Sequence, residues 1–119
     1  AGGLRYHGMA PIICHLHKLG LVEAQAVPQT ACFEAGVRFA RIEGIISAPE
    51  PCHNLKVAMD EALKCRESGE AKTILIAHSG HGHFDLAAYD AYLSGKLQDY
   101  AYPEEEVRKA QLELPEVPG

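Results

Sequence analysis

The stretch 73-TILIAHSGHGHFD-85 decides the fold that the sequence predicts. Its first half is a short β-rich run bounded by turn residues, as in a buried parallel strand. Its second half gathers three histidines, two glycines and a serine, and the helix-like run "FDLAAYDAYLSG" then ends at Gly95. A strand, a glycine loop and a helix in this order are typical of α/β proteins, which bind ligands beyond the ends of their strands.

The rest of the chain continues this alternation. Helices are predicted over 11–20 and 30–44 and in the stretch that follows Glu50, and further strands over 21–27 and 45–47. We therefore expect a single α/β domain over residues 1–119, with a small, mostly parallel sheet flanked by helices. Only two strands are clear, which is too few for a stable sheet and first suggests a part of something larger.

Local signals set the ends of the predicted helices. Thr30 is expected to N-cap the second helix and Gly44 to end it, while Ser47 and Glu50 have the spacing of a capping box for the third. The tail, 103–119, has acidic residues at a helix start and could form one more short helix. One face of the second helix should be buried, and it carries Cys32, Phe33, Gly36, Val37 and Ala40.

Composition excludes several classes of function. The chain has 119 residues, 47% of them hydrophobic, and a formal net charge of −5, without the Lys/Arg cluster of a nucleic-acid-binding protein. No apolar run reaches the roughly 20 residues of a membrane span, and no signal peptide is visible. The four cysteines form no C-x-x-C motif, so we expect reduced core residues in a cytoplasmic protein; they are Cys14, Cys32, Cys52 and Cys65.

The loop allows four interpretations. His78, His81 and His83 could bind zinc, although their spacing matches no standard zinc motif. Ser79 could be a nucleophile, although a nucleophile elbow needs glycine where Ala77 stands. The glycines could instead bring the backbone close to a ligand, or the loop could be a plain strand-to-helix turn. The local pattern leaves the last two interpretations equally open.

Three stretches now occur in a telling order: 3-GLRYHGMAP-11, 41-RIEGIISAPEPCH-53 and 74-ILIAHSGHGHFD-85. Together they closely resemble the C-terminal part of the tryptophan synthase beta chain, above all the second class of that family. The resemblance covers residues 3–97. It implies a fold-type II pyridoxal-phosphate enzyme with two α/β domains and the cofactor between them. It also implies a lyase of tryptophan biosynthesis, which replaces the β-hydroxyl of serine by indole to give L-tryptophan.

The resemblance also implies roles for individual residues. Ser79 would hydrogen-bond the pyridine nitrogen of pyridoxal 5'-phosphate on the loop of Gly80 and Gly82. A serine hydroxyl is too weak an acid to protonate that nitrogen, so the cofactor would be a moderate electron sink that suits elimination of a β-hydroxyl. Glu50 would lie beside the cofactor ring as the catalytic carboxylate, although the capping box explains it equally well. His81 would lie on the substrate side of the pocket. The backbone carbonyls that would bind a monovalent cation belong to Leu4, Tyr6 and Gly8.

Arg5 is a departure from the main class of the family, which has aspartate there. A cation at this position, on the substrate side of the pocket, would favour O-phosphoserine over serine as the donor. The family's Schiff-base lysine and phosphate-binding loop belong to motifs that this sequence does not contain. We therefore expect a C-terminal fragment that is inactive and free of cofactor alone. Exposed apolar surface should make it a homo-oligomer, and a stand-alone α/β binding or interaction module is the alternative.

Overall fold

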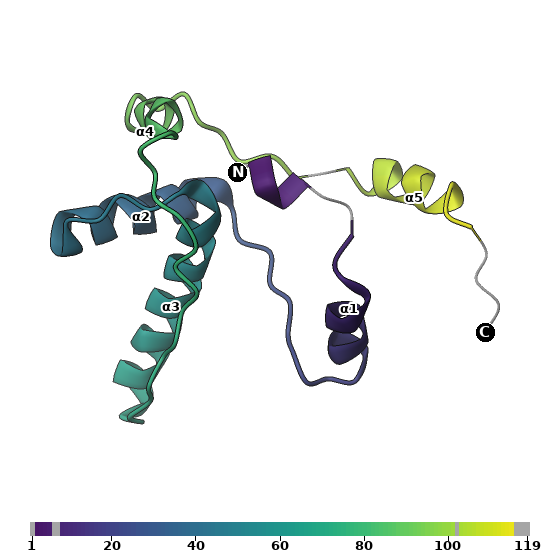
Figure 1. Ribbon diagram of the computed structural model, residues 1–119, viewed down its shortest axis with the longest axis horizontal. Coiled ribbons are helices and arrows are strands. Elements are labelled where there is room, and N and C mark those ends of the chain that lie inside the picture. The colour runs from purple at the N-terminus through teal and green to yellow at the C-terminus, as the bar shows by residue number, and fades with distance from the viewer. Residues whose placement is uncertain (1, 6–7, 102, 116–119) are drawn as a thin grey trace.

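Helices make up the regular structure of the described residues, 2–5, 8–101 and 103–115, of the computed structural model (Figure 1). Proline begins two of the helices and glycine ends two, since Pro11 and Pro49 occupy first turns and Gly44 and Gly69 follow last turns with φ of 71° and 73°. The elements are η1 (Gly2–Arg5), α1 (Pro11–Lys18), α2 (Gln29–Glu43), α3 (Pro49–Ser68), α4 (Leu86–Leu93) and α5 (Glu104–Leu112).

The predicted α/β fold is wrong, because no strand forms within the described residues. Segments 21–27 and 73–79 are irregular, and residues of both line a groove of about 430 Å³ together with residues of α3. No backbone hydrogen bond joins the two described segments, and a β-rich sequence without a paired strand makes no ladder. The third predicted strand, 45–47, contributes only one isolated antiparallel bridge, between Ser47 and His81.

The helix stops were predicted correctly, but the helix caps were not. Gly44 ends α2 as expected, yet Thr30 lies inside its first turn. The backbone amide of Thr30 donates to Asp99 Oδ1 at 3.0 Å and its hydroxyl donates to Asp99 Oδ2, so a carboxylate 69 residues away caps the helix. Ser47 does not cap α3 either, because Ala48 is the N-cap residue and no side chain bonds there.

The core lies where α2, α3 and α4 meet. The buried face of α2 supplies Cys32 and Phe33, as predicted, and Cys52 of α3 and Tyr89 of α4 complete the cluster. The ring of Phe33 meets that of Tyr89 edge-on at 5.0 Å. All four cysteines are free thiols, but Cys14 is exposed and Cys65 half-buried, so the expectation of core cysteines holds for only two of them.

The remaining helices leave much of the surface open. Among the described residues α1 and α5 pack against no other helix, and Figure 1 shows both standing apart from the core. The radius of gyration is 17.0 Å, against roughly 13.5 Å for a compact domain of this length. The exposed area is 9643 Å², whereas roughly 6300 Å² is typical of a monomer of this mass.

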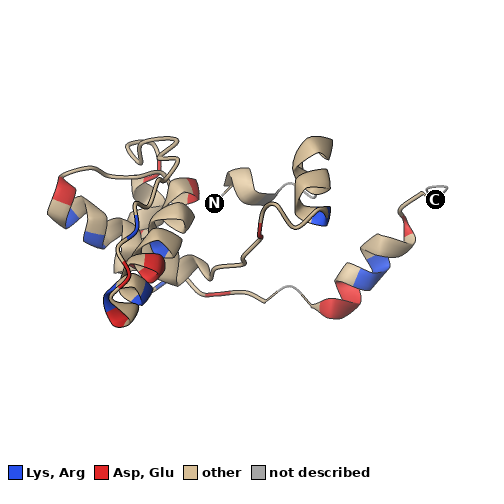
Figure 2. Cartoon of the chain, turned by 90° about the horizontal axis from the view of Figure 1, so that it is seen from below, with Lys and Arg blue, Asp and Glu red and all other residues tan. Residues whose placement is uncertain are grey.

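Charge is mixed along the helices rather than gathered in one patch (Figure 2). The tail helix α5 begins with Glu104, Glu105 and Glu106, and Lys109 pairs with the last two. No helix in the described part of the chain is long and apolar enough to cross a membrane.

Candidate functional site

The glycine loop packs against the segment that leads into α3. The Ala48 amide donates to the Gly80 carbonyl at 3.1 Å, and the Gly82 amide donates to the Ile46 carbonyl at 2.8 Å. The isolated bridge between Ser47 and His81 lies between these two bonds. The loop is therefore held by backbone hydrogen bonds to residues more than 30 positions earlier in the chain.

Both glycines of the loop are required by this packing. Gly80 has φ of 132°, which residues with a side chain rarely adopt. A Cβ atom on Gly82 would lie 2.4 Å from the Ser47 carbonyl oxygen and 2.8 Å from Ile46 Cγ2. These contacts account for the two glycines before any ligand is considered.

Ser79 presents its hydroxyl at the exposed turn of the loop. Its backbone amide donates to the Ala77 carbonyl at 3.1 Å, but its side chain makes no hydrogen bond within the described residues. A hydroxyl in this state can donate to, or accept from, a ligand without first losing a protein partner.

Glu50 joins the first of the three motif stretches to the second. It lies in the first turn of α3, and its Oε1 accepts the backbone amide of Gly3 at 2.8 Å. That hydrogen bond lowers the pKa of the Glu50 carboxyl. Because Gly80 bonds Ala48 just before α3, stretches 3–11, 41–53 and 74–85 all converge at the start of this helix.

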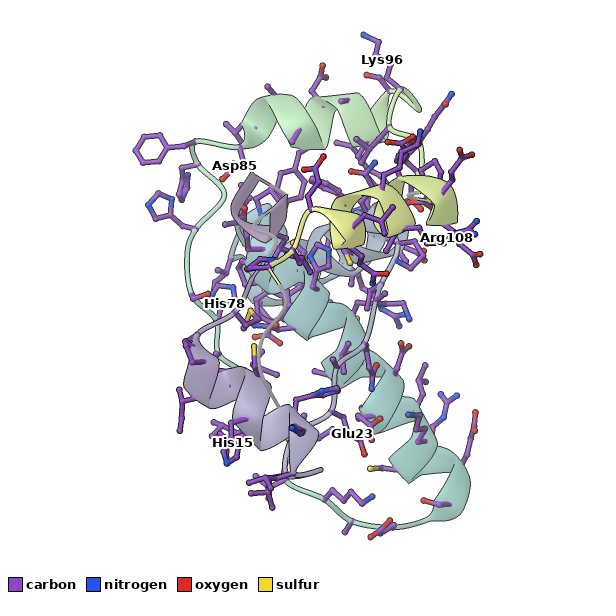
Figure 3. The ribbon with its side chains drawn as sticks, turned by 90° about the vertical axis from the view of Figure 1, so that its right-hand side faces the viewer. His15, Glu23, His78, Asp85, Lys96 and Arg108 are labelled. Carbon is purple, nitrogen blue, oxygen red and sulfur yellow. The ribbon has the colours of Figure 1, made fainter. Side chains whose placement is uncertain are left out.

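The three histidines of the loop do not converge. His81 is exposed, with its ring 5.0 Å from that of His83 and 5.4 Å from that of Phe84. His78 lies before the loop and Asp85 after it (Figure 3), and the His78 ring is directed to Ser47 instead, with Nε2 2.7 Å from Oγ. No group of three metal-binding side chains exists among the residues that the structure describes, so the zinc interpretation finds no support there.

Ser47 was predicted to cap a helix, but it lies at the centre of a buried hydrogen-bond network. It is 0% exposed, its carbonyl accepts the Tyr89 hydroxyl at 2.6 Å, and its own hydroxyl meets His78. The Cys52 thiol lies 3.3 Å from the Tyr89 oxygen, and since that hydroxyl already donates to Ser47, the thiol is the donor. A serine inside the apolar run "IIS" was the only signal in the sequence for this buried network.

Burial sets the protonation of the groups behind the loop. Desolvation raises the pKa of the Cys32 thiol to about 11 and raises the pKa of the Cys52 thiol and the Tyr89 hydroxyl. These groups therefore stay neutral near pH 7 and act as packing and hydrogen-bonding elements rather than as nucleophiles.

The predicted cation loop is described only in part. Leu4 belongs to η1 and Gly8 is exposed, whereas Tyr6 and the side chain of Arg5 lie outside the described residues. The structure therefore leaves these three carbonyls and Arg5 as predictions.

No family model matches the chain. Individual proteins do, and the tryptophan synthase beta chain 2 of Aquifex aeolicus is 62% identical over 99 residues, or 83% of this chain. The chain is homologous to one segment of the tryptophan synthase beta chains. The beta chain 2 of Methanothermobacter thermautotrophicus is 58% identical over 82% of this chain, and the beta chain of Thermococcus onnurineus is 51% identical over 88%. The chain spans only 23%, 23% and 24% of the lengths of these three relatives.

Proposed function

We propose that the chain is the C-terminal segment of a tryptophan synthase beta chain, a pyridoxal-phosphate lyase that replaces the β-hydroxyl of serine by indole. The kinship with the beta-chain family supports this proposal. The location of the proposed site rests on one observation, which is that the three motif stretches meet at the start of α3. The bonds of Gly3 to Glu50 and of Ala48 to Gly80 join them there.

The residues present fit one edge of pyridoxal 5'-phosphate. An exposed serine hydroxyl without a protein partner among the described residues suits the pyridine nitrogen, and the exposed Gly80 leaves the backbone beside it without a side chain. When bound, the cofactor supplies the electron sink for the reaction. Ser79 would leave the ring nitrogen of a bound cofactor unprotonated, because a serine hydroxyl holds its proton far more tightly than a carboxyl does.

Glu50 and His81 complete the proposed site on the described side. Glu50 is a carboxylate whose pKa the Gly3 amide lowers further, so it suits orienting a cationic amine better than accepting a proton. The exposed His81 lies in the loop between Gly80 and Gly82, and its proposed role is to contact substrate. Arg5 is proposed to bind the donor, and the carbonyls of Leu4, Tyr6 and Gly8 to bind a monovalent cation.

A comparison of Ser79 variants in the full-length protein tests the role of the loop. Ser79→Asp should protonate the ring nitrogen, shift the absorption of the bound cofactor and change the ratio of replacement to elimination products. Ser79→Asn is the matched control, because it has nearly the same shape as aspartate but carries no acid. Identical spectra and product ratios in the wild type and Ser79→Asp would refute the assignment.

The donor is tested separately. If Arg5 recognises a phosphate, Arg5→Asp should lower kcat/KM for O-phosphoserine at least about tenfold and change that for serine much less. Equal effects on the two donors would rule out phosphate recognition by this side chain.

The open surface supports a segment of a larger assembly over a stand-alone module. The chain exposes roughly 3300 Å² more than a compact monomer of its mass, and Leu75 and Phe84 are 95% and 92% exposed. We propose that the isolated chain forms homo-oligomers, binds no cofactor covalently and functions, as part of its parent, in the cytoplasm. Light scattering of the isolated chain, and mass spectrometry after treatment with pyridoxal phosphate and borohydride, test the first two statements. A monodisperse monomer would contradict the first, and stoichiometric labelling of one lysine the second.

A further inference from the structure

The backbone on both sides of Ser79 is fixed by three separate anchors. The Asn54 side chain of α3 donates to the Ala77 carbonyl at 2.7 Å, and the Ala48 amide donates to the Gly80 carbonyl. Between them, the His78 ring meets the buried hydroxyl of Ser47. Ser79 therefore projects a free hydroxyl from a run of chain that is held immediately before and after it.

The contact between Ser47 and His78 is the only one of these anchors in which both partners act through their side chains. Ser47 is completely buried, so its hydroxyl hydrogen must find an acceptor in the protein. Among the described residues that acceptor is His78 Nε2, at 2.7 Å. A Ser47 hydroxyl that donates here requires Nε2 without a hydrogen, which places the hydrogen of a neutral ring on Nδ1.

A hydrogen bond from α4 holds Ser47 in place. The Ser47 carbonyl accepts the Tyr89 hydroxyl at 2.6 Å, so α4 fixes the residue that fixes His78. The ring of His78 also lies 5.7 Å from that of Phe39 of α2, which limits its rotation. Contacts with α2 and α4 therefore fix the position of His78, the residue directly before Ser79.

We propose that Ser47 and His78 are positioning residues for Ser79, which set the direction of its hydroxyl toward the ligand of the glycine loop. The nature of that ligand rests on the proposed function, whereas the positioning of the loop does not. Neither residue touches the ligand in this proposal, and both act through the backbone of the loop.

Nuclear magnetic resonance of the 119-residue chain tests the positioning without any cofactor. Ring nitrogen shifts should show His78 with Nδ1 protonated and Nε2 unprotonated. In Ser47→Ala, hydrogen exchange of the Gly82 amide should accelerate about tenfold, the usual effect of losing one buried hydrogen bond, while amides in the middle of α2 and α3 stay protected. Unchanged exchange at Gly82, or a His78 ring protonated on Nε2, would overturn the proposal.

A conservative replacement separates positioning from mere packing. His78→Gln keeps an acceptor near the position of Nε2 and should retain most of the protection of Gly82, whereas His78→Leu should lose it. His83→Leu is the matched control, because His83 is an exposed histidine of the same loop whose ring lies beside that of His81 rather than against Ser47. If Ser47→Ala does not fold, the comparison of the three histidine variants decides alone, and equal protection in His78→Gln and His78→Leu refutes the role.

The link to the ligand is measured in the full-length protein by equilibrium binding of pyridoxal 5'-phosphate. His78→Leu should weaken binding about tenfold and His83→Leu should not change it. A wild-type protein that binds no pyridoxal phosphate would refute the proposed function but leave the exchange result standing. Normal binding by His78→Leu, together with faster exchange at Gly82, would show that the loop is anchored without serving this ligand.

Discussion

Gly36 should be the least replaceable residue of the helix junction. It lies on the buried face of α2, and an added Cβ atom would be 2.5 Å from Cys52 Sγ and 2.9 Å from the Tyr89 hydroxyl oxygen. Both neighbours are buried and hydrogen-bonded to each other, so neither can move aside freely. Gly36→Ala must therefore separate α2 from α3 and α4 or break the bond from Cys52 to Tyr89.

The expected cost of Gly36→Ala follows from three contributions. Overpacking of a buried site costs about 1–3 kcal/mol. A lost hydrogen bond adds about 1 kcal/mol. Alanine recovers about 1 kcal/mol through its higher helix propensity. The free energy of unfolding should therefore fall by about 2 kcal/mol.

Urea unfolding of the chain, followed by circular dichroism, measures this loss. The double variant Gly36→Ala/Cys52→Ala gives the sharper comparison, because removing the sulfur opens the space that the new methyl group needs. Its destabilisation should be smaller than the sum of the two single effects by at least about 1 kcal/mol. A Gly36→Ala variant as stable as the wild type, or strictly additive single effects, would refute the predicted steric conflict.

Three further perturbations test other parts of the structure. The hydrogen bonds from Thr30 hold the pKa of Asp99 below its usual value, so the stabilisation by this carboxylate is complete above the unfolded-state pKa near 4 and is lost as pH falls through the folded value. Asp99→Asn should thus destabilise the chain at pH 7, and the destabilisation should disappear as pH falls through the folded-state pKa, as pH-dependent unfolding curves would show. Tyr89→Phe leaves the Ser47 carbonyl without its donor and should cost about 1–2 kcal/mol in urea unfolding. Iodoacetamide should alkylate the exposed Cys14 on the order of 100-fold faster than the buried Cys52, a ratio that peptide mass mapping over time can determine.

The sequence predicted the helices well and the sheet wrongly, for a physical reason. Helix ends depend on residues within a turn of each other, so Pro11 and Gly44 were readable as a start and a stop. A sheet forms only where a second strand lies alongside the first, and composition does not predict which segment that is. The run 73–77 has the residues of a strand, but no neighbouring strand among the described residues to pair with.

Long-range partners also explain the errors at individual residues. Ser47 and Glu50 have capping-box spacing, but tertiary contacts use both side chains elsewhere, with His78 and with the Gly3 amide. The cap of α2 comes from Asp99, at a distance in sequence that no local pattern covers. The bonds of Gly3 to Glu50 and of Ala48 to Gly80 join segments far apart in the sequence, and local spacing alone could not have predicted them.

The helix junction and the glycine loop form one mechanical unit, so the stability of the first controls the geometry of the second. A methyl group on Gly36 presses on the Tyr89 hydroxyl, which donates to Ser47, whose hydroxyl holds His78 beside Ser79. Gly36→Ala should therefore speed exchange of the Gly82 amide by more than the global loss of stability explains, although it lies on another helix. If exchange at Gly82 and in the middle of α3 accelerate by the same factor, the junction transmits only unfolding. A larger factor at Gly82 would show that packing between the helices stabilises the glycine loop beyond its effect on global unfolding.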